Sequence, residues 1–310
     1  MNTENAPSSA MKVLAAVVTH NRMDLLSRCL DNLLLQTRAT DAILVINNAS
    51  TDGTVQMLVS RGIPHITQEN LGSAGGWHRA IQYAQDKFFD AVWLMDDDGY
   101  PADNALEVLV KSMTSDIACV SSVVVCEEDS RRLVFPMPKL NKRGLPCITA
   151  WPRKHSRLVD LRRFAKSDTY DFAHLFNGAL ISIAATRSVG NVDQSFFMSG
   201  DEVDYFFRLR TVGKVISVLN ALHYHPDVSN RPYTHAKIYY YVKNSLSLNA
   251  RYFDHPWLRN VMVIAAALFR TARRNGLAAS ASLLMGGGSG VFYKAIARGL
   301  GGEIAKDFGA

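Results

Sequence analysis

Four short strand-like runs in the first hundred residues, each followed by polar residues and then by a helical pattern, constrain the fold most. They occupy residues 13–18, 42–46, 63–68 and 91–95. In the segments between them, apolar residues recur every three or four positions, as in residues 24–36, which is the period of an amphipathic helix. Strands that alternate with helices favour an open, mostly parallel α/β sheet. Because ligands bind beyond the carboxyl ends of strands in such sheets, the polar segments predict one shared site.

Three later apolar runs and a helical pattern extend this alternation. Further strands are predicted at residues 117–125, 180–183 and 215–219, with a helix at 201–212. Residues 127–171 are basic and proline-containing and show no clear periodicity. We therefore predict an α/β domain at 11–232 and a helical extension at 233–310, after a polar leader at 1–10 that we expect to be disordered.

Composition limits which cellular compartment and which classes of ligand we expect for this chain. The chain has 310 residues and a net charge of +6, which suits anionic ligands but does not imply a nucleic-acid partner, and we predict none. Its 4 cysteines contain no C-x-x-C pair, which favours a reducing compartment over a disulfide framework or a zinc site. No secretory signal is visible, and no apolar run reaches the ~20 residues that span a bilayer. We expect a cytoplasmic protein.

The run at residues 91–95 leads directly into three aspartates, Asp96, Asp97 and Asp98. Adjacent carboxylates at the end of a buried strand repel one another, and a bound cation would relieve this repulsion. Carboxylate oxygens suit Mg²⁺ or Mn²⁺, above all where phosphates complete the ligand set. In an extended chain Asp96 and Asp98 point to one side and Asp97 to the other, so the first and third are expected to share a ligand. The alternative is a solvated acidic turn that caps the next helix.

Five polar motifs stand in order at the predicted strand ends. They are Val-Thr-His-Asn-Arg at 18–22, Asn-Asn-Ala-Ser-Thr-Asp-Gly-Thr at 47–54, Asn-Leu-Gly-Ser-Ala-Gly-Gly at 70–76, Asp-Asp-Asp at 96–98, and Asp-Glu-Val-Asp with a following Arg at 201–208. Together they resemble the family 2 inverting glycosyltransferases, which have the GT-A fold. The third and fourth motifs look most like the galactofuranosyltransferase and rhamnosyltransferase branch, which builds bacterial surface polysaccharides such as O-antigens.

The resemblance implies transfer of a sugar from a nucleotide-diphosphate donor, such as UDP-galactofuranose, to a hydroxyl of a lipid-linked or polysaccharide acceptor. The leaving diphosphate must be neutralised, the hydroxyl needs a base, and the nucleotide must be positioned. Within the family, dTDP-rhamnose-dependent transfer is the alternative. Outside it, the competitors are a non-catalytic nucleotide-sugar-binding module and a nucleotidyltransferase, although residues 19–22 lack the Gly-rich loop usual in the latter.

The resemblance also assigns the metal site. Asp98 is the first-choice ligand of Mn²⁺ or Mg²⁺, and Asp96 is a second ligand or a partner of the ribose hydroxyls. Asp97 is expected to be structural or at the edge of the acceptor site. Family members often carry a further ligand histidine after the last sheet strand, and His225 matches that position better than His223. The alternative for either histidine is an ordinary surface or core residue.

For the general base, the resemblance points to the acidic pair at the start of the predicted helix. The second member of the pair is usually the base, and it maps to Glu202, a glutamate where aspartate is commoner. Asp201 is the reserve candidate. A carboxylate at a helix N-terminus is held ionised by the helix dipole. The alternative is that the pair only caps the helix.

Donor-binding residues follow from the same motifs. The set implied by the resemblance is Thr19, Arg22, Asp52, Asn70, Gly75, Gly76, Arg79 and Asp96. Asp52 resembles the carboxylate that accepts from the uracil or thymine N3–H, although Asp-Gly is also a plain turn. The glycines would let the backbone approach the diphosphate at a helix N-terminus, and Arg79 would pair with a phosphate.

The region 233–310 combines apolar faces with flanking Lys and Arg residues. Such faces suit helices that lie on an anionic membrane, here the inner face of the cytoplasmic membrane. Packing on the sheet or in a homo-oligomer interface is the alternative. Residues 239–244 resemble the family's Tyr-Tyr-x-x-Arg-Asn segment, so Lys243 is predicted to meet a lipid-linked diphosphate. Trp77 and Trp93 are expected in the core, and Trp151 is left open as an acceptor contact.

Overall fold

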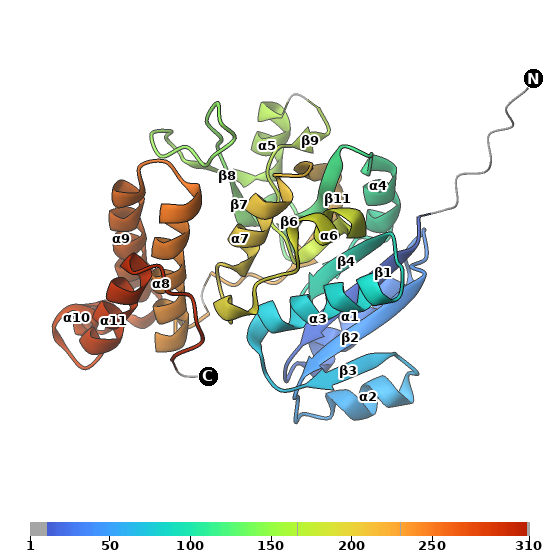
Figure 1. The fold of residues 1–310 in the computed structure, drawn as a ribbon, viewed down its shortest axis with the longest axis horizontal. Coiled ribbons are helices and arrows are strands. Elements are labelled where there is room, and N and C mark those ends of the chain that lie inside the picture. Colours follow the sequence, from blue (N-terminus) through green and yellow to red (C-terminus); the bar gives the residue numbers. More distant parts are fainter. Residues whose placement is uncertain (1–10, 166, 230, 309–310) are drawn as a thin grey trace, which may run out of the picture.

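The computed structural model describes residues 11–165, 167–229 and 231–308. The leader predicted at 1–10 lies outside the described residues. A sheet of 11 strands forms the centre, in the order β3-β2-β1-β4-β10-β6-β11-β5 (Figure 1). Off this path, β7 pairs with β6 and with β8, and β9 pairs with β11.

The first four strands confirm the predicted alternation. They are β1 (Val13–Thr19), β2 (Ala42–Asn48), β3 (His65–Gln68) and β4 (Ala91–Asp96). All neighbouring pairs among them run parallel, with β1 between β2 and β4. β10 (Asn177–Ser182) enters antiparallel between β4 and β6 (Ile117–Cys126), and β6 runs parallel to β11 (Lys214–His225). The sheet is therefore mostly parallel, as expected.

Every residue of β1 is buried, and its successive side chains alternate between two hydrophobic cores. Both faces of the sheet are therefore covered by helices. Val13, Ala15 and Val17 pack with α1 (Met23–Leu34), α2 (Thr54–Ser60) and α4 (Ala105–Ser112). Leu14, Ala16 and Val18 pack on the other face with α3 (Gly72–Asp86), α6 (Ile183–Val189) and α7 (Asp201–Leu209).

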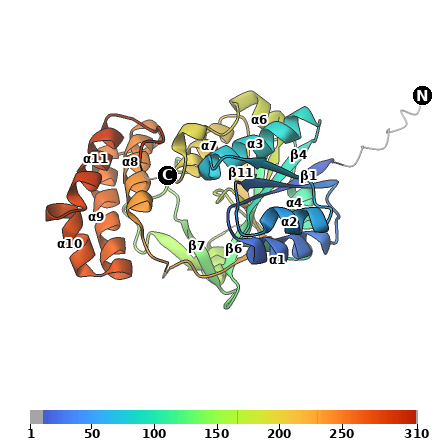
Figure 2. The ribbon, with the colours of Figure 1, turned by 90° about the horizontal axis from the view of Figure 1, so that it is seen from below.

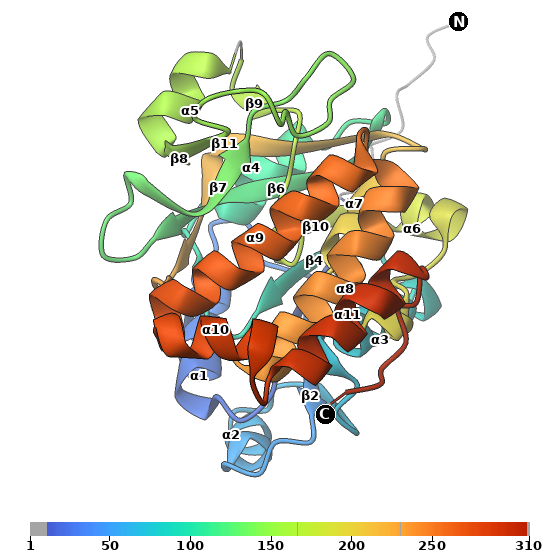
Figure 3. The same cartoon turned by 90° about the vertical axis from the view of Figure 1, so that its left-hand side faces the viewer.

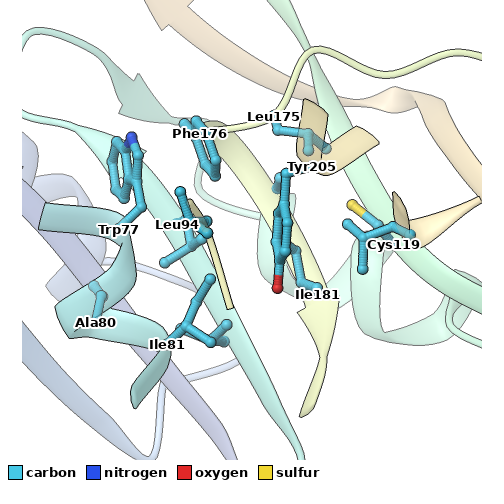
Figure 4. Close-up of a cluster of buried hydrophobic side chains, with 14 of the residues drawn as sticks. Trp77, Ala80, Ile81, Leu94, Cys119, Leu175, Phe176, Ile181 and Tyr205 are labelled. Atoms are coloured by element: carbon cyan, nitrogen blue, oxygen red, sulfur yellow. The ribbon is translucent and has the colours of Figure 1, made fainter. Parts of the chain in front are cut away.

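Aromatic stacking fills the second of these cores. Trp77 of α3 lies over Phe176 with ring centroids 4.8 Å apart, and Tyr205 of α7 lies on the other side of Phe176 (Figure 4). Trp93 is buried in the opposite core. The predicted core positions of Trp77 and Trp93 are therefore confirmed.

The segment without periodicity forms a small layer at one end of the sheet. It contains β7 (Arg132–Pro138), β8 (Lys154–Arg157), α5 (Leu158–Phe164) and β9 (Thr169–Tyr170). Outside this layer, two further short elements are β5 (Tyr100–Pro101) and the 3₁₀ helix η1 (Gln194–Phe196). Trp151 lies in this layer with 90% of its surface exposed, so it does not belong to the core.

Four helices make up the predicted C-terminal extension: α8 (His235–Tyr252), α9 (Pro256–Asn275), α10 (Leu277–Met285) and α11 (Ser289–Leu300). They form a layer of their own beside the sheet (Figures 1 and 3). Over the described residues, no helix is both long enough and apolar enough to cross a bilayer.

Lys243 of α8 does not meet a lipid diphosphate, contrary to our prediction. Its side chain is fully buried, and its ammonium group donates to Asp307 at 2.7 Å and to the carbonyl of Ala305. Tyr239 donates to the same carboxylate at 2.6 Å. This buried ion pair fastens the C-terminal tail onto α8, and a buried charge without its partner would be strongly destabilising.

Candidate active site

The polar segments that follow β1, β2, β3 and β4 do meet, at the carboxyl edge of the parallel strands. They surround a cavity of about 260 Å³, which we call the donor cavity. Its polar lining consists of Thr19, His20, Arg22, Asn48, Asn70, Gly72, Ser73, Asp96 and Asp97. The predicted shared site is thus present, because parallel strands end at one edge.

The three aspartates do not alternate as an extended chain would. β4 ends at Asp96, and Asp97 and Asp98 lie in a turn, so the period of two stops there. Asp97 accepts from Thr19 Oγ1 at 2.8 Å and from Arg22 at 2.9 Å. Asp96 and Asp97 both line the donor cavity, and the expectation that Asp97 points away from it is wrong.

Asp98 shares Arg22 with Asp97 and also contacts two side chains from the C-terminal half of the chain. Its Oδ1 lies 3.0 Å from His225 Nε2, and its Oδ2 accepts from Arg231 at 2.8 Å and lies 3.1 Å from Arg22. Burial alone would raise the pKa of Asp98, but hydrogen bonds from His225 and Arg231 hold it well below the ordinary value. Asp98 is thus an ionised carboxylate at neutral pH.

His225 has the orientation of a metal-binding imidazole. Its Nδ1 lies 2.7 Å from the carbonyl oxygen of Pro226, which can only accept, so Nδ1 carries a proton. Nε2 faces the carboxylate of Asp98 at 3.0 Å, where it donates a hydrogen bond, and a bound cation would take the place of that proton. In histidines that bind a metal, the ring nitrogen that does not bind it usually donates to a carbonyl or carboxylate in this way.

His223 is placed differently, although it lies on the same strand. It is fully buried beneath the aspartate turn, and a Cβ added at Gly99 would come within 2.3 Å of its Nε2. Burial and the neighbouring His225 lower its pKa to about 3. Of the two histidines left open by the sequence, only His225 contacts Asp98.

Asp98 and His225 therefore fit a divalent cation, and they supply two ligands. Within residues 11–165, 167–229 and 231–308, no group of three or more His, Cys, Asp or Glu side chains forms a complete cage. Mg²⁺ commonly binds one or two carboxylates plus substrate phosphates, so the remaining ligands would come from a phosphate-bearing ligand and water. Burial, with the charges of Asp98 and Asp97, raises the pKa of Asp96 well above its ordinary value.

The acidic pair lies at the start of α7, directly after a tight turn. Gly200 has φ of 104°, in the left-handed region, and a Cβ there would lie 3.0 Å from Asn244 Cβ. Asn244 of α8 donates to the carbonyl of Ser199 at 2.6 Å and to those of Phe196 and Met198 at 3.2 Å. The C-terminal helices thus fix the turn that positions the pair.

Asp201 and Glu202 each accept a hydrogen bond from another segment of the chain. Asp201 is buried and accepts from Ser73 Oγ of the donor cavity at 3.2 Å. Glu202 Oε1 accepts from the backbone N–H of Leu175 at 2.7 Å and lies 3.2 Å from His174 Nδ1. The N-cap residue is Gly200, so neither carboxylate occupies the N-cap position, and the contacts with Ser73 and Leu175 go beyond those of a simple helix cap.

The other predicted donor contacts divide into two groups. Asn70 lines the donor cavity, and its Oδ1 accepts from the N–H of Gly72 at 3.0 Å. Gly75 and Gly76 are instead buried in the helix–sheet contact, where a Cβ on Gly76 would lie 2.5 Å from Val18. Of the glycines in the 70–76 motif, Gly72 lines the cavity, next to Ser73.

Arg79 and Asp52 both lie outside the set of residues that line the donor cavity. Arg79 is exposed on α3, away from the cavity lining, and donates to Gln82 at 3.3 Å. Asp52 accepts from Thr54 Oγ1 at 2.5 Å and from the N–H of Met23 at 3.0 Å. It serves as the turn residue that the alternative described, because its short side chain reaches the adjacent backbone.

Three side chains at this site carried no signal of their own in the sequence. Arg231 reaches Asp98, His174 reaches Glu202, and Ser73 reaches Asp201. Each lies in an irregular segment or at a helix start, and each finds its partner across 28 to 133 residues of chain. Periodicity does not predict contacts of this kind.

Comparison with known proteins then identifies the family. The sequence model of "Glycosyl transferase family 2" matches residues 15–177. The chain belongs to glycosyltransferase family 2. It is 34% identical over 224 residues to galactofuranosyltransferase GlfT1 of Mycolicibacterium smegmatis, which covers 69% of this chain and 70% of the relative. It is 36% identical, with the same coverage, to galactofuranosyltransferase GlfT1 of Mycobacterium tuberculosis.

Solved structures agree on the fold. A mannosyltransferase from Pyrobaculum calidifontis, in complex with GDP-Man and Mn²⁺, superposes with a TM-score of 0.52 at 17% identity and covers 94% of this chain and 85% of its own. A mycobacterial protein reaches 0.52 at 19% identity, covering 78% and 75%. The protein is a glycosyltransferase with the GT-A fold and a C-terminal helical region, which rules out the non-catalytic module and the nucleotidyltransferase.

The buried carboxyl of Asp201 should give this glycosyltransferase a measurable pH dependence of stability. Burial and the charge of Glu202 raise its pKa from 3.8 to about 7. Between these values the folded state keeps a proton that the unfolded chain has lost, so stability falls as pH rises. Asn cannot titrate, so the free energy of unfolding of Asp201→Asn relative to that of wild type should rise between pH 4 and pH 8. We expect this rise to be roughly 2–4 kcal/mol.

Urea unfolding without ligands at pH 4, 6 and 8 measures this difference. Asp86→Asn, at an exposed aspartate near the end of α3, is the control and should show no such trend. A pH-independent difference between Asp201→Asn and wild type would contradict the assignment.

Proposed function

We propose that this glycosyltransferase is an inverting galactofuranosyltransferase that transfers galactofuranose from UDP-galactofuranose to a hydroxyl of a lipid-linked or polysaccharide acceptor. The similarity to two galactofuranosyltransferases supports the choice of sugar. The position of the acidic pair between two cavities supports the proposed transfer from a donor to an acceptor. Asp201 contacts Ser73 at the donor cavity, and Glu202 lines a second, largely apolar cavity of about 150 Å³.

On the donor side, cationic groups are placed to neutralise the leaving diphosphate. Arg22 lines the donor cavity with 42% of its side chain exposed, and Arg231 lies beside it on Asp98. Fixed positive charge near a leaving phosphate stabilises the transition state. Asp98 and His225 would hold Mn²⁺ or Mg²⁺, which supplies Lewis-acid neutralisation of the diphosphate when bound.

On the acceptor side, Glu202 can take a proton. Its Oε1 is occupied by Leu175 N–H and His174, which fix the carboxylate. The side chain is 36% exposed and lines the second cavity, and its other oxygen is left to accept from an acceptor hydroxyl bound there. In the proposed step the hydroxyl oxygen attacks the anomeric carbon, its proton passes to Glu202, and the bond to the diphosphate oxygen breaks. A single displacement from the opposite face inverts the configuration.

A panel of sugar nucleotides tests the donor. Slow hydrolysis without an acceptor, followed as release of nucleoside diphosphate, should be fastest with UDP-galactofuranose. UDP-galactopyranose and UDP-glucose are the ring-form controls. A preference for dTDP-rhamnose would overturn the choice of sugar and favour a rhamnosyltransferase.

We also propose that the C-terminal helices hold the protein peripherally at the inner face of the cytoplasmic membrane. Exposed apolar side chains gather on α9, α10 and α11: Trp257, Val261, Phe269, Leu277, Met285, Tyr293 and Leu300. Exposed Arg273 and Lys294 accompany them. Apolar and basic groups together favour an anionic lipid surface.

Liposome flotation should show this attachment. We expect the protein to float with vesicles containing anionic lipid and to remain below with purely zwitterionic ones. The triple variant Trp257→Ser/Phe269→Ser/Leu277→Ser should lose flotation while its circular dichroism stays that of wild type. Equal recovery with and without anionic lipid, or full flotation of the triple variant, would contradict membrane attachment through these helices.

A further inference from the structure

A groove distinct from the donor cavity runs between the sheet domain and the C-terminal helices. Strand β7 and the segment after it form one wall, and α8 and α9 form the other (Figures 2 and 3). Its main part measures about 340 Å³ and continues into an overlapping cavity of about 320 Å³. We call it the helix groove.

The inner end of the helix groove reaches the acidic pair. The small cavity lined by Glu202 shares Pro146, Phe172, His174, Val203 and Phe253 with the groove. A molecule whose hydroxyl lies at Glu202 therefore has space to extend its remaining atoms toward α9. Among the described residues, none that lines the groove also lines the donor cavity, so the two cavities leave space for both substrates at once.

The outer end of the helix groove is cationic. Lys154 of β8 and Arg259 and Arg270 of α9 line it. Arg259 is already neutralised, because it donates to the carboxylate of Asp254 at 2.5 Å and to the carbonyl of Pro146 at 2.7 Å. In the described part of the chain, no carboxylate lies within 4.0 Å of the Lys154 ammonium or the Arg270 guanidinium.

Lys154 and Arg270 act on one another. Lys154 is exposed at the rim of the groove, where partial desolvation lowers the pKa of its ammonium group and the charge of Arg270 lowers it further. The charge of Glu202 acts on the pKa of Lys154 in the opposite direction. Arg270 is held in place by Tyr241, whose ring lies 4.7 Å from the guanidinium carbon.

Two neighbouring cations without an acidic partner suit a ligand with concentrated negative charge. A phosphate or diphosphate offers several acceptor oxygens to both side chains at once, and charge-assisted hydrogen bonds of this kind are the strong ones. The prolines and phenylalanines between the two ends of the groove offer apolar contact to the part of the ligand that joins its phosphate to its hydroxyl.

We propose that the helix groove binds the acceptor, and that Lys154 and Arg270 bind a phosphate or diphosphate group that the acceptor carries, with its reactive hydroxyl at Glu202. This inference rests on the proposed transfer reaction. The phosphate has two sources with the same chemistry, a polyprenyl-diphosphate headgroup or a phosphate on a soluble glycan.

Equilibrium binding in metal-free buffer tests the site with defined probes. Inorganic pyrophosphate and farnesyl diphosphate are titrated into wild type and Lys154→Gln/Arg270→Gln, with farnesol as the probe without phosphate. We expect the double variant to lose about tenfold or more in affinity for both phosphate probes, since each lost charged hydrogen bond weakens binding severalfold or more. Unchanged affinity in the double variant would overturn the proposal.

Matched variants separate this site from the donor site and from a loss of folding. Lys154→Arg should retain binding, and Lys87→Gln, at an exposed lysine after α3, should match wild type. Arg231→Gln removes a cation at Asp98 and should leave binding in the groove intact. If only Arg231→Gln weakens the probes, they bind at the donor site and the assignment is wrong.

The two phosphate probes distinguish the sources. Tighter binding of farnesyl diphosphate than of pyrophosphate indicates a lipid-linked acceptor, and equal binding indicates that only the phosphate is recognised. Acceptor-independent hydrolysis of UDP-galactofuranose should be unchanged in the double variant. Normal hydrolysis with undiminished probe binding would refute the groove assignment alone, whereas absent hydrolysis in wild type would refute the proposed function.

Discussion

Glu202→Gln is expected to lower kcat by about 10²–10⁴-fold, which is the usual contribution of a positioned base. Glutamine has nearly the same shape, and its carbonyl oxygen can still accept from the N–H of Leu175, so the local structure should persist. Donor affinity should stay close to wild type, because Glu202 lies outside the donor cavity. Steady-state kinetics together with UDP binding measure both effects.

The partner variant Asp201→Asn tests which member of the pair is the base. Glu107→Gln, on the exposed face of α4, is the control and should keep full activity. If Glu202→Gln retains most activity while Asp201→Asn loses it, the base is Asp201, whose raised pKa near 7 also suits proton transfer. Retained activity in both variants would refute the carboxylate mechanism.

Asp98→Ala is expected to abolish metal-dependent donor binding. Asp98 is the one residue that contacts His225, Arg22 and Arg231 together among the described residues, so its loss removes a cation ligand and leaves two arginines without their partner. We expect UDP affinity in the presence of Mn²⁺ to fall by at least ~100-fold, because even residues behind a ligand are worth 10–100-fold. Calorimetry with UDP, with and without Mn²⁺, measures this effect.

Chelation provides the independent test of the same site. Wild-type transfer should cease in excess EDTA and return when Mn²⁺ or Mg²⁺ is added. Asp103→Ala, at an exposed aspartate just before α4, should behave as wild type in both assays. Full activity in excess EDTA would exclude a metal role for Asp98 and His225.

Local sequence patterns predicted the scaffold because they reflect local physics. Alternating burial along β1 requires two covered faces, and the helical periods on either side supply the covers. Polar residues directly after β1, β2 and β4 could be assigned to one edge because parallel strands end together. The donor cavity was predictable from these two facts.

The same patterns failed where the chain changes conformation. The turn at Asp97 and Asp98 ends the strand alternation, so these side chains point where a strand would not send them. His223 and His225 lie on the same side of β11, and their spacing could not separate them. Only packing decides between them, since His223 is covered by Gly99 while His225 extends past it to Asp98.

The sequence by itself determined the order of strands and helices, the edge of the sheet at which the site lies, and the residue types that the chemistry requires. The tertiary structure alone decided which of these residues meet: Glu202 with Leu175, Arg231 with Asp98, and Lys243 with the C-terminal tail instead of a ligand. Periodicity reports a residue's immediate neighbours in the chain, whereas these pairs are up to 133 residues apart. Their contacts depend on how whole layers pack, and the buried charges are stable only where that packing supplies a partner.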